Sequence, residues 1–184
     1  IERAEDDIYM LYTGGTTGMP KGVMYAQGGR ALGLMESGYP LIGVTAPTDA
    51  ADVAALIGGA VRAGNHQIAI PACPLMHGTG MWLGAMTPHL MGGTVITLAA
   101  RSLDADELLT VAQREGATLV VIVGDPFARP IVAAIDAAIE AGTPYDLSAL
   151  KLIVSSGVMW TSEVKEQLMD RLHRSEEHTY EIQS

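Results

Sequence analysis

The chain has few basic residues, few charges overall and a single cysteine. Its 184 residues include 11 Lys and Arg against 21 Asp and Glu, which gives a formal net charge of −10. A protein that binds a phosphate backbone needs a basic face, so this balance argues against nucleic acid as the main partner. Hydrophobic residues make up 48% and charged residues only 17%, a composition typical of a globular chain rather than a disordered one.

The single cysteine, Cys73, excludes a disulfide within the chain and fits a reducing compartment. No apolar run reaches the roughly 18 residues of a membrane span, and no secretory signal is visible. We therefore expect a cytoplasmic protein without a transmembrane segment. The sequence leaves the oligomeric state open, with a homo-oligomer as one option.

The stretch from Tyr12 to Gly22 reads Tyr-Thr-Gly-Gly-Thr-Thr-Gly-Met-Pro-Lys-Gly. Glycines allow close backbone approach, and successive N–H groups can form a concavity that binds anions. Threonine hydroxyls can ligate a hard cation, and the Lys21 ammonium suits a phosphate. The stretch therefore predicts a phosphate-binding loop. The alternative is a flexible hairpin loop that ends in a solvated lysine.

Two common nucleotide motifs do not fit this loop. The G-x-x-x-x-G-K-[ST] pattern needs Gly directly before Lys, whereas here Pro20 precedes Lys21. The G-x-G-x-x-G pattern fails because position 13 is Thr. The flanking segments, residues 8–12 and 23–25, are apolar and predict strands, the first of them buried.

A second informative stretch runs from Ala72 to Trp82 and contains His77 between small residues. Helical spacing follows it, because Leu83, Met86 and Leu90 can share one face. His77 is thus expected at a junction between a loop and a helix, where a ligand can approach. The alternative is a histidine with a purely structural role.

The remainder alternates between strand and helix patterns. Asp104 and Glu107 form a capping-box pattern for a helix that ends at Gly116, and the apolar run 118–123 suits a strand covered on both faces. Further helices are expected at residues 31–35, 52–63, from near Pro130 to Gly142, and after a Thr161 cap, with strands at 94–98 and 151–154. In the last of these helices Val164, Leu168 and Leu172 share one face. This order predicts an α/β fold with a layered, mostly parallel sheet and flanking helices.

Ligands of parallel sheets bind beyond the carboxyl ends of the strands. We expect the first loop and the Ser155-Ser-Gly157 turn to lie at such ends. Asp125 and Arg129 are interpreted as an exposed ion pair of small energetic value without a catalytic role.

Together these motifs resemble the adenylate-forming superfamily, which contains acyl-CoA synthetases, luciferases and peptide-synthetase adenylation domains. The loop from Tyr12 to Val23 is similar to its signature loop, and Pro74-Leu-Met-His-Gly-Thr-Gly80 is similar to its second motif. Residues 123–130 and 154–160 look like a bacterial acyl-CoA synthetase subgroup that acts on fatty acids or sterol side chains. The resemblance covers about residues 8–173.

The resemblance implies that a carboxylic acid reacts with ATP to give an acyl-adenylate, and then with coenzyme A to give a thioester. It implies ATP, Mg²⁺ and coenzyme A as cosubstrates and cofactors, with Lys21 and His77 as the catalytic residues and Thr13 near Mg²⁺. It assigns to ATP the residues Thr13, Gly14, Gly15, Thr16, Thr17, Gly18, Lys21, Ser155, Ser156 and Gly157. It assigns to the acyl group the residues His77, Gly78, Gly80, Gly157 and Val158.

The resemblance also implies missing parts. Residues 1–173 correspond to part of the N-terminal domain of an adenylate-forming enzyme, while a later magnesium-binding glutamate, a ribose-binding aspartate and the C-terminal domain are absent. Residues 174–184 are similar to the translation of a sequencing adapter, so we expect a non-native tail. We therefore expect a fragment of an acyl-CoA synthetase that is inactive alone.

Two other functions remain as alternatives. One is another adenylate-forming ligase, such as an amino-acid adenylation domain, which needs an acidic partner for the substrate ammonium. The other is a non-catalytic ATP-binding module, which would bind nucleotide through the same loop and ignore acyl chains.

Overall fold

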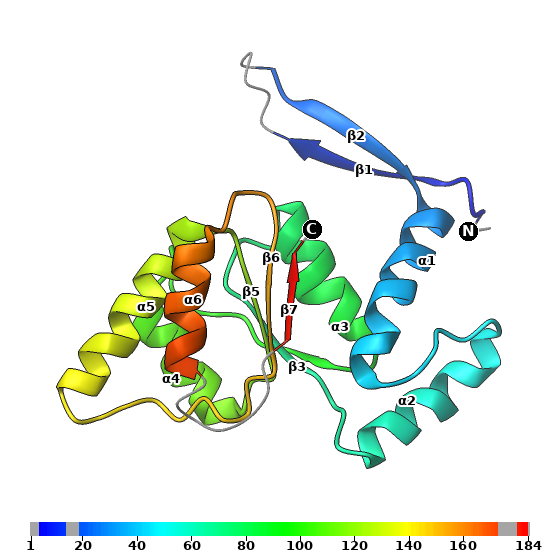
Figure 1. Ribbon diagram of the computed structural model, residues 1–184. Coiled ribbons are helices and arrows are strands. Elements are labelled where there is room, and N and C mark those ends of the chain that lie inside the picture. The colour runs from blue at the N-terminus through cyan, green and yellow to red at the C-terminus, as the bar shows by residue number, and fades with distance from the viewer. Residues whose placement is uncertain (1–3, 14–18, 173–179, 184) are drawn as a thin grey trace. The chain divides into compact units, whose positions relative to one another are not determined.

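The computed structural model describes residues 4–13, 19–172 and 180–183 (Figure 1). The chain divides into two compact units, Ile1–Asn65 and His66–Ser184. Each unit has its own sheet, and none of the strand pairs described joins one unit to the other. The two units are therefore considered separately.

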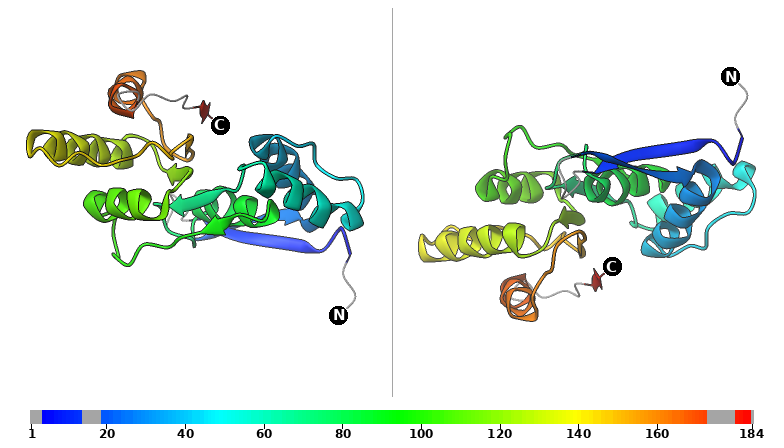
Figure 2. Two further views of the ribbon diagram at one scale, coloured as in Figure 1. Left: turned by 90° about the horizontal axis from the view of Figure 1, so that it is seen from below. Right: turned by 90° about the horizontal axis from the view of Figure 1, so that it is seen from above.

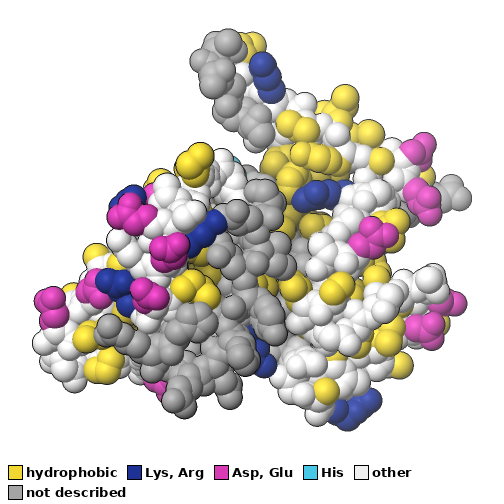
Figure 3. All heavy atoms as spheres, in the orientation of Figure 1, with side chains coloured by type: hydrophobic (Ala, Val, Ile, Leu, Met, Phe, Trp, Pro, Cys, Tyr) yellow, Lys and Arg dark blue, Asp and Glu magenta, His cyan; other side chains and the backbone are white. Residues whose placement is uncertain are grey.

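The first unit begins with an antiparallel hairpin of β1 (Ile8–Thr13) and β2 (Lys21–Ala26), in which Thr13 lies opposite Lys21. The prediction of two strands around the first loop is confirmed. The prediction that the first of them is buried is wrong, because Ile8 is 58% exposed and Tyr12 68%. Figure 3 shows hydrophobic side chains along this hairpin. Apolar composition does not reveal how many strands a sheet has, and here each strand pairs with one neighbour only.

Helices complete the first unit. They are α1 (Gln27–Gly38), the 3₁₀ turns η1 (Tyr39–Ile42) and η2 (Ala50–Asp52), and α2 (Val53–Arg62). Helix α1 is longer than the expected 31–35 although it contains several glycines, because tertiary packing outweighs their poor helix propensity. The buried apolar side chains of this unit are few: Leu34, Tyr39, Ile42 and Ala60.

The second unit contains a parallel sheet with the strand order β4-β3-β5-β6-β7. The strands are β3 (Ile68–Pro71), β4 (Thr94–Val95), β5 (Leu119–Ile122), β6 (Leu152–Ser155) and β7 (Tyr180–Gln183). Every residue of β5 is buried, which confirms the expectation of a central strand covered on both faces. The mostly parallel α/β fold is thus confirmed, although β4 is shorter than the predicted 94–98.

Five helical segments surround this sheet. They are η3 (Thr79–Met86), which is a π-helix, α3 (Thr87–Leu90), α4 (Ala105–Glu115), α5 (Asp125–Glu140) and α6 (Ser162–Leu172). The π-helix η3 packs on β3 and β5, and helices α4, α5 and α6 pack side by side on the other side of the sheet (Figures 1 and 2). Val164 and Leu168 of α6 are fully buried, as their spacing predicted.

The helix ends follow the sequence signals in part. Asp104 caps α4 by accepting a hydrogen bond from the backbone N–H of Glu107 at 3.0 Å, and Gly116 ends the helix in the left-handed conformation. The carboxylate of Glu107 does not return to Asp104. It accepts hydrogen bonds from the backbone N–H groups of Ala99 and Ala100 and so holds the preceding loop.

Helix α5 begins at Asp125 and not near Pro130, which lies inside the helix. Pro126 takes the first-turn position that the sequence analysis gave to Pro130. Pro130 lacks the N–H that would bond the carbonyl four residues earlier, so α5 tolerates one missing hydrogen bond.

Strand β7 lies within residues 174–184, which the sequence analysis interprets as a non-native tail. It pairs in parallel with β6, with Leu152 opposite Tyr180. Strand pairing does not test where a segment comes from, so that interpretation stays a prediction. Within the described ranges, no helix is long and apolar enough to cross a membrane.

Candidate functional site

The candidate site lies at the carboxyl ends of three neighbouring strands of the second unit. Strand β5 is hydrogen-bonded to β3 on one side and to β6 on the other, and all three run in the same direction. The segments that leave them, residues 72–79, 123–125 and 156–161, must therefore emerge at one edge of the sheet. The Ser155-Ser-Gly157 turn belongs to these segments, as expected from the sequence, and so does the second motif, for which no such place was predicted.

Gly157 is the point where these segments meet. Its φ of +97° is one that residues with a side chain rarely adopt. A Cβ built on it would lie 3.6 Å from Cε1 of His77, 3.6 Å from Oγ1 of Thr79 and 3.7 Å from Cγ1 of Val123. The structure thus brings His77 and Gly157 together, as expected. The sequence analysis missed Thr79 and Val123 as members of this cluster.

Thr79 connects the second motif to the turn after β6. It is buried, its backbone N–H donates to Nδ1 of His77 at 3.3 Å, and its hydroxyl donates to the carbonyl of Ser156 at 3.4 Å. Because Nδ1 accepts a hydrogen bond, the neutral ring of His77 carries its proton on Nε2. The ring therefore has an N–H donor on its opposite side.

The glycine of the second motif at position 80 has a packing role. A Cβ there would overlap the carbonyl oxygen of Pro74 and would lie 2.9 Å from that of Cys73. The missing side chain lets the π-helix η3 lie directly against the preceding loop. The predicted acyl contacts of Gly78, Gly80 and Val158 stay predictions, with Val158 52% exposed.

Ser155 is buried, and its Oγ accepts a hydrogen bond from the backbone N–H of Gly124 at 2.9 Å. Gly124 has a φ of +57°, and a Cβ on it would lie 2.5 Å from the carbonyl oxygen of Met159. Ser155 therefore joins the ends of β5 and β6. Binding of ATP by Ser155, Ser156 and Gly157 stays a prediction.

The predicted ion pair of Asp125 with Arg129 is confirmed, and Asp125 also has a partner that was not predicted, Thr161. Its carboxylate accepts hydrogen bonds from the backbone N–H of Thr161 at 2.8 Å, from the Thr161 hydroxyl at 2.9 Å and from Arg129 at 3.0 Å. Thr161 directly precedes α6, as expected of its cap, and its hydroxyl donates to this carboxylate. The Thr161 N–H, followed by the Thr161 hydroxyl and Arg129, holds the pKa of Asp125 below its usual value against the opposing effect of desolvation.

The first motif lies in the other unit, and much of it is outside the described residues. This holds for Gly14, Gly15, Thr16, Thr17, Gly18 and the side chain of Thr13. Lys21 is exposed and begins β2. The expectation that this motif leaves a parallel strand is wrong, because β1 and β2 are antiparallel. A short connection is compatible with that arrangement, whereas parallel neighbours need a long crossover.

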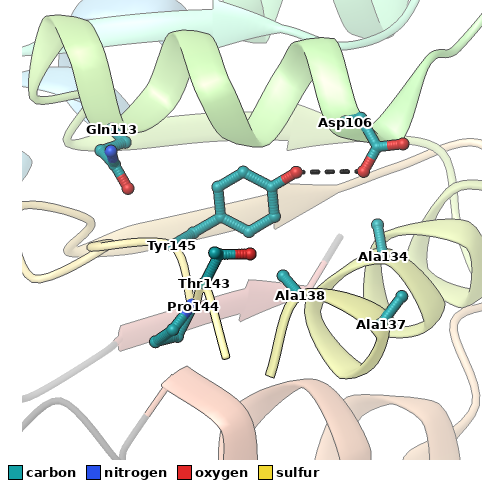
Figure 4. A pocket seen from close by; sticks show the side chains of 8 residues that line it. All are labelled: Asp106, Gln113, Ala134, Ala137, Ala138, Thr143, Pro144 and Tyr145. Carbon is teal, nitrogen blue, oxygen red and sulfur yellow. Dashed lines mark hydrogen bonds between the residues drawn. The ribbon is translucent and has the colours of Figure 1, made fainter. Parts of the chain in front are cut away.

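Two of the cavities in the described part of the second unit are large, and both lie outside the cluster around Gly157. One, of about 510 Å³, is lined by α4, α5 and the loop after α5 (Figure 4). In it the Tyr145 hydroxyl donates to Asp106 at 3.0 Å, and desolvation together with this carboxylate raises the pKa of Tyr145.

The other cavity, of about 450 Å³, is lined in part by Cys73, Leu75, Arg101 and Phe127. Burial raises the pKa of the Cys73 thiol to about 11. Among the residues that the structure describes, no group of three or more His, Cys, Asp and Glu side chains could hold a metal ion.

Comparison with known proteins gives consistent relatives. A sequence model described as AMP-binding enzyme matches residues 1–180. The chain is 35% identical over 181 residues to the medium-chain acyl-CoA ligase Mig of Mycobacterium avium, covering 94% of this chain and 30% of that protein. It is 34% identical over 176 residues to a medium/long-chain-fatty-acid–CoA/3-oxocholest-4-en-26-oate–CoA ligase of Mycolicibacterium smegmatis, covering 92% and 29%.

The fold is shared with the luciferase-like enzyme of the mealworm Zophobas morio. The TM-score is 0.64 at 17% identity, covering 95% of this chain and 34% of that one. At this identity the likeness concerns the fold alone. The chain spans about 30% of the length of the curated relatives described above.

Proposed function

Because the chain belongs to the AMP-binding enzyme family, we propose that it is part of an ATP-dependent acyl-CoA ligase. The carboxylate of the acid attacks the α-phosphorus of ATP, pyrophosphate leaves, and an acyl-adenylate forms. The thiol of coenzyme A then attacks the acyl carbon, and AMP leaves. The substrates proposed are fatty acids or sterol-derived acids, as in the names of the relatives.

The observation that carries this proposal is the grouping of His77, Thr79 and Val123 around Gly157. The groups that face this point are an imidazole, a hydroxyl and a methyl. The Nε2–H of His77 can donate to a carboxylate oxygen, and the open side of Gly157 lets a flat or narrow ligand approach the backbone. An acid without an ammonium group fits these neighbours better than an amino acid does.

The carboxylate closest in sequence to this cluster, that of Asp125, already has hydrogen-bond donors. Asp125 accepts hydrogen bonds from Thr161 and Arg129, so it is poorly placed to receive a substrate ammonium. This favours the acyl-CoA ligase over the amino-acid adenylation domain.

The first unit is proposed to bind phosphates. Lys21 supplies a positive charge beside the glycine- and threonine-rich loop, which suits the phosphate groups of ATP. Enzymes of this type use Mg²⁺ to offset phosphate charge, and the ion is proposed to bind near the Thr13 hydroxyl. The cytoplasmic location and the oligomeric state stay predictions.

The test compares Lys21→Ala with His77→Ala. Binding of ATP and of a non-hydrolysable acyl-adenylate analogue is measured by calorimetry, with exposed Lys151→Ala and His89→Ala as matched controls. An acyl-CoA ligase site should lose analogue binding in both variants, by about tenfold or more for each lost charged or polar contact. A bare ATP-binding module would be indifferent to His77→Ala, and that result would overturn the proposal.

A further inference from the structure

The loop between β6 and α6, residues 156–161, is held at both of its ends. At the first end the Ser156 carbonyl accepts the Thr79 hydroxyl. At the second end Trp160 is buried in the core of the second unit and Thr161 is bound by Asp125. Between these ends Val158 and Met159 are exposed, at 52% and 77%. The shape of the loop therefore depends on its end contacts and not on the burial of its middle.

The second end is fixed by several contacts to one corner of the fold, the junction of β5 and α5. The backbone N–H of Asp125 donates to the Met159 carbonyl at 3.1 Å, while its carboxylate receives both the N–H and the hydroxyl of Thr161. Gly124 packs against the carbonyls of Val158 and Met159, where a Cβ would lie 2.7 and 2.5 Å from their oxygens. The corner and the loop thus form one closely packed body.

We infer that Asp125 is a positioning residue that holds the 156–161 loop in the shape that presents Gly157 to His77 and Thr79. Its carboxylate accepts the backbone N–H and the hydroxyl of Thr161 and so fixes the second end of the loop. Asp125 need not touch substrate, because it acts through the position of Gly157. The inference rests on the proposed function only where it extends to ligand binding.

An ion pair between α5 and α6 provides a control. Asp136 of α5 binds Arg171 of α6 at 2.6 Å, about three turns further along α5 than Asp125. It links the two helices directly, whereas Asp125 links the start of α5 to Thr161, the residue before α6. Only removal of Asp125 should change the loop.

The experiment measures amide hydrogen exchange by NMR in the 184-residue chain and its Asp125→Ala and Asp136→Ala variants. Asp125→Ala should lower the protection of the Thr161 amide, which donates to Asp125, and of the residue-125 amide, which donates to the Met159 carbonyl, by about tenfold or more relative to the amides of β5. Asp136→Ala should change loop and β5 amides in parallel. Equal effects of the two variants on the loop, or none from Asp125→Ala, would overturn the inference.

A milder pair keeps the test informative if Asp125→Ala does not fold. Thr161→Ser keeps the hydroxyl that Asp125 accepts, and Thr161→Val removes it at similar size. Loop protection should be retained in the first variant and reduced in the second. Equal protection in both variants would show that the Thr161 hydroxyl does not hold the loop, and would contradict the proposed role of its bond to Asp125.

Ligand binding separates this inference from the proposed function. Asp125→Ala should weaken binding of the acyl-adenylate analogue by about tenfold, while Asp136→Ala at an equal folded fraction should leave it unchanged. If the unaltered chain does not bind the analogue, the proposed function fails for this chain, and the exchange data alone decide the role of Asp125. If it binds and Asp125→Ala binds equally well, the inference fails and the proposed function stands.

Discussion

Apolar strand side chains are exposed in the first unit of the chain and buried in the second. In the first unit β1 pairs with one strand, and Ile8, Met10 and Tyr12 are 58%, 43% and 68% exposed. In the second unit β5 lies between two strands and is buried along its whole length. The side chains of β5 are covered by η3 and by side chains of α4, α5 and α6, whereas β1 pairs with β2 alone, so the difference arises from what covers the faces of each strand. Truncating an apolar strand side chain should therefore cost more stability in the second unit than in the first.

The largest effect expected from this comparison is at Ile122. Truncation to Ala removes a fully buried side chain of β5 and should lower the free energy of unfolding by about 2–5 kcal/mol. Ile8→Ala in β1 should change it by less than about 0.5 kcal/mol, since that side chain is already in water. Urea unfolding followed by tryptophan fluorescence measures the second unit alone, because Trp82 and Trp160 both belong to it. Backbone circular dichroism follows both units, and equal losses in the two variants would contradict the comparison.

A smaller effect is expected from glycine substitutions, with opposite signs in the two units. Gly80→Ala places a Cβ against the Pro74 carbonyl and should cost about 1–3 kcal/mol. Gly29→Ala in α1 meets nothing within 4 Å and should stabilise that helix by about 0.5–1 kcal/mol. Melting temperatures of both variants check this pair. A stabilised Gly80→Ala variant would show that η3 does not pack against its preceding loop as described.

The smallest effect is a dependence of stability on pH through Asp125. Its pKa in the folded state lies below the ordinary 3.8, because Thr161 and Arg129 favour the carboxylate. At pH values above the ordinary pKa, the contacts of the Asp125 carboxylate therefore stabilise the second unit. This contribution is lost as the pH falls through the lower pKa of the folded state. The difference in urea midpoint between the unaltered chain and Asp125→Asn should shrink below about pH 4.

Asp146 is the control for that measurement. Its pKa is also lowered, by the hydroxyl and backbone N–H of Ser148. It lies in the loop after α5 and not in the 156–161 loop. Asp146→Asn should thus produce a similar pH trend in stability without altering exchange at Thr161. A midpoint difference for Asp125→Asn that stays constant down to pH 3 would contradict the ionic role assigned to this carboxylate.

Much of the second unit could be predicted because its signals are local. The apolar run 118–123 predicted a buried strand, Asp104 predicted a helix start, and the spacing of Val164, Leu168 and Leu172 predicted the buried face of α6. The start of α5 was misplaced because two prolines, Pro126 and Pro130, both fit a first helical turn. The exposure of β1 could not be predicted, because burial depends on neighbours that the segment itself does not specify.

The candidate site could be predicted only where motifs carry it. His77 and Gly157 were found from their motifs. Thr79, although it lies in the same motif as His77, and Val123 were not predicted as site residues, because their approach to Gly157 depends on tertiary contacts. Val123 directly follows β5, and this position beyond a parallel strand was the one available signal. Asp125 was assigned to a surface ion pair because Arg129 lies one helical turn away, while its stronger partner, Thr161, is 36 residues distant.

The hydrogen bond between Thr79 and Ser156 also affects how the protein is made, because it spans 77 residues of chain. A ribosome adding on the order of 5–20 residues per second takes roughly 4–15 seconds to extend the chain from one partner to the other. During that interval the segment that carries His77 exists without the strand that completes its surroundings.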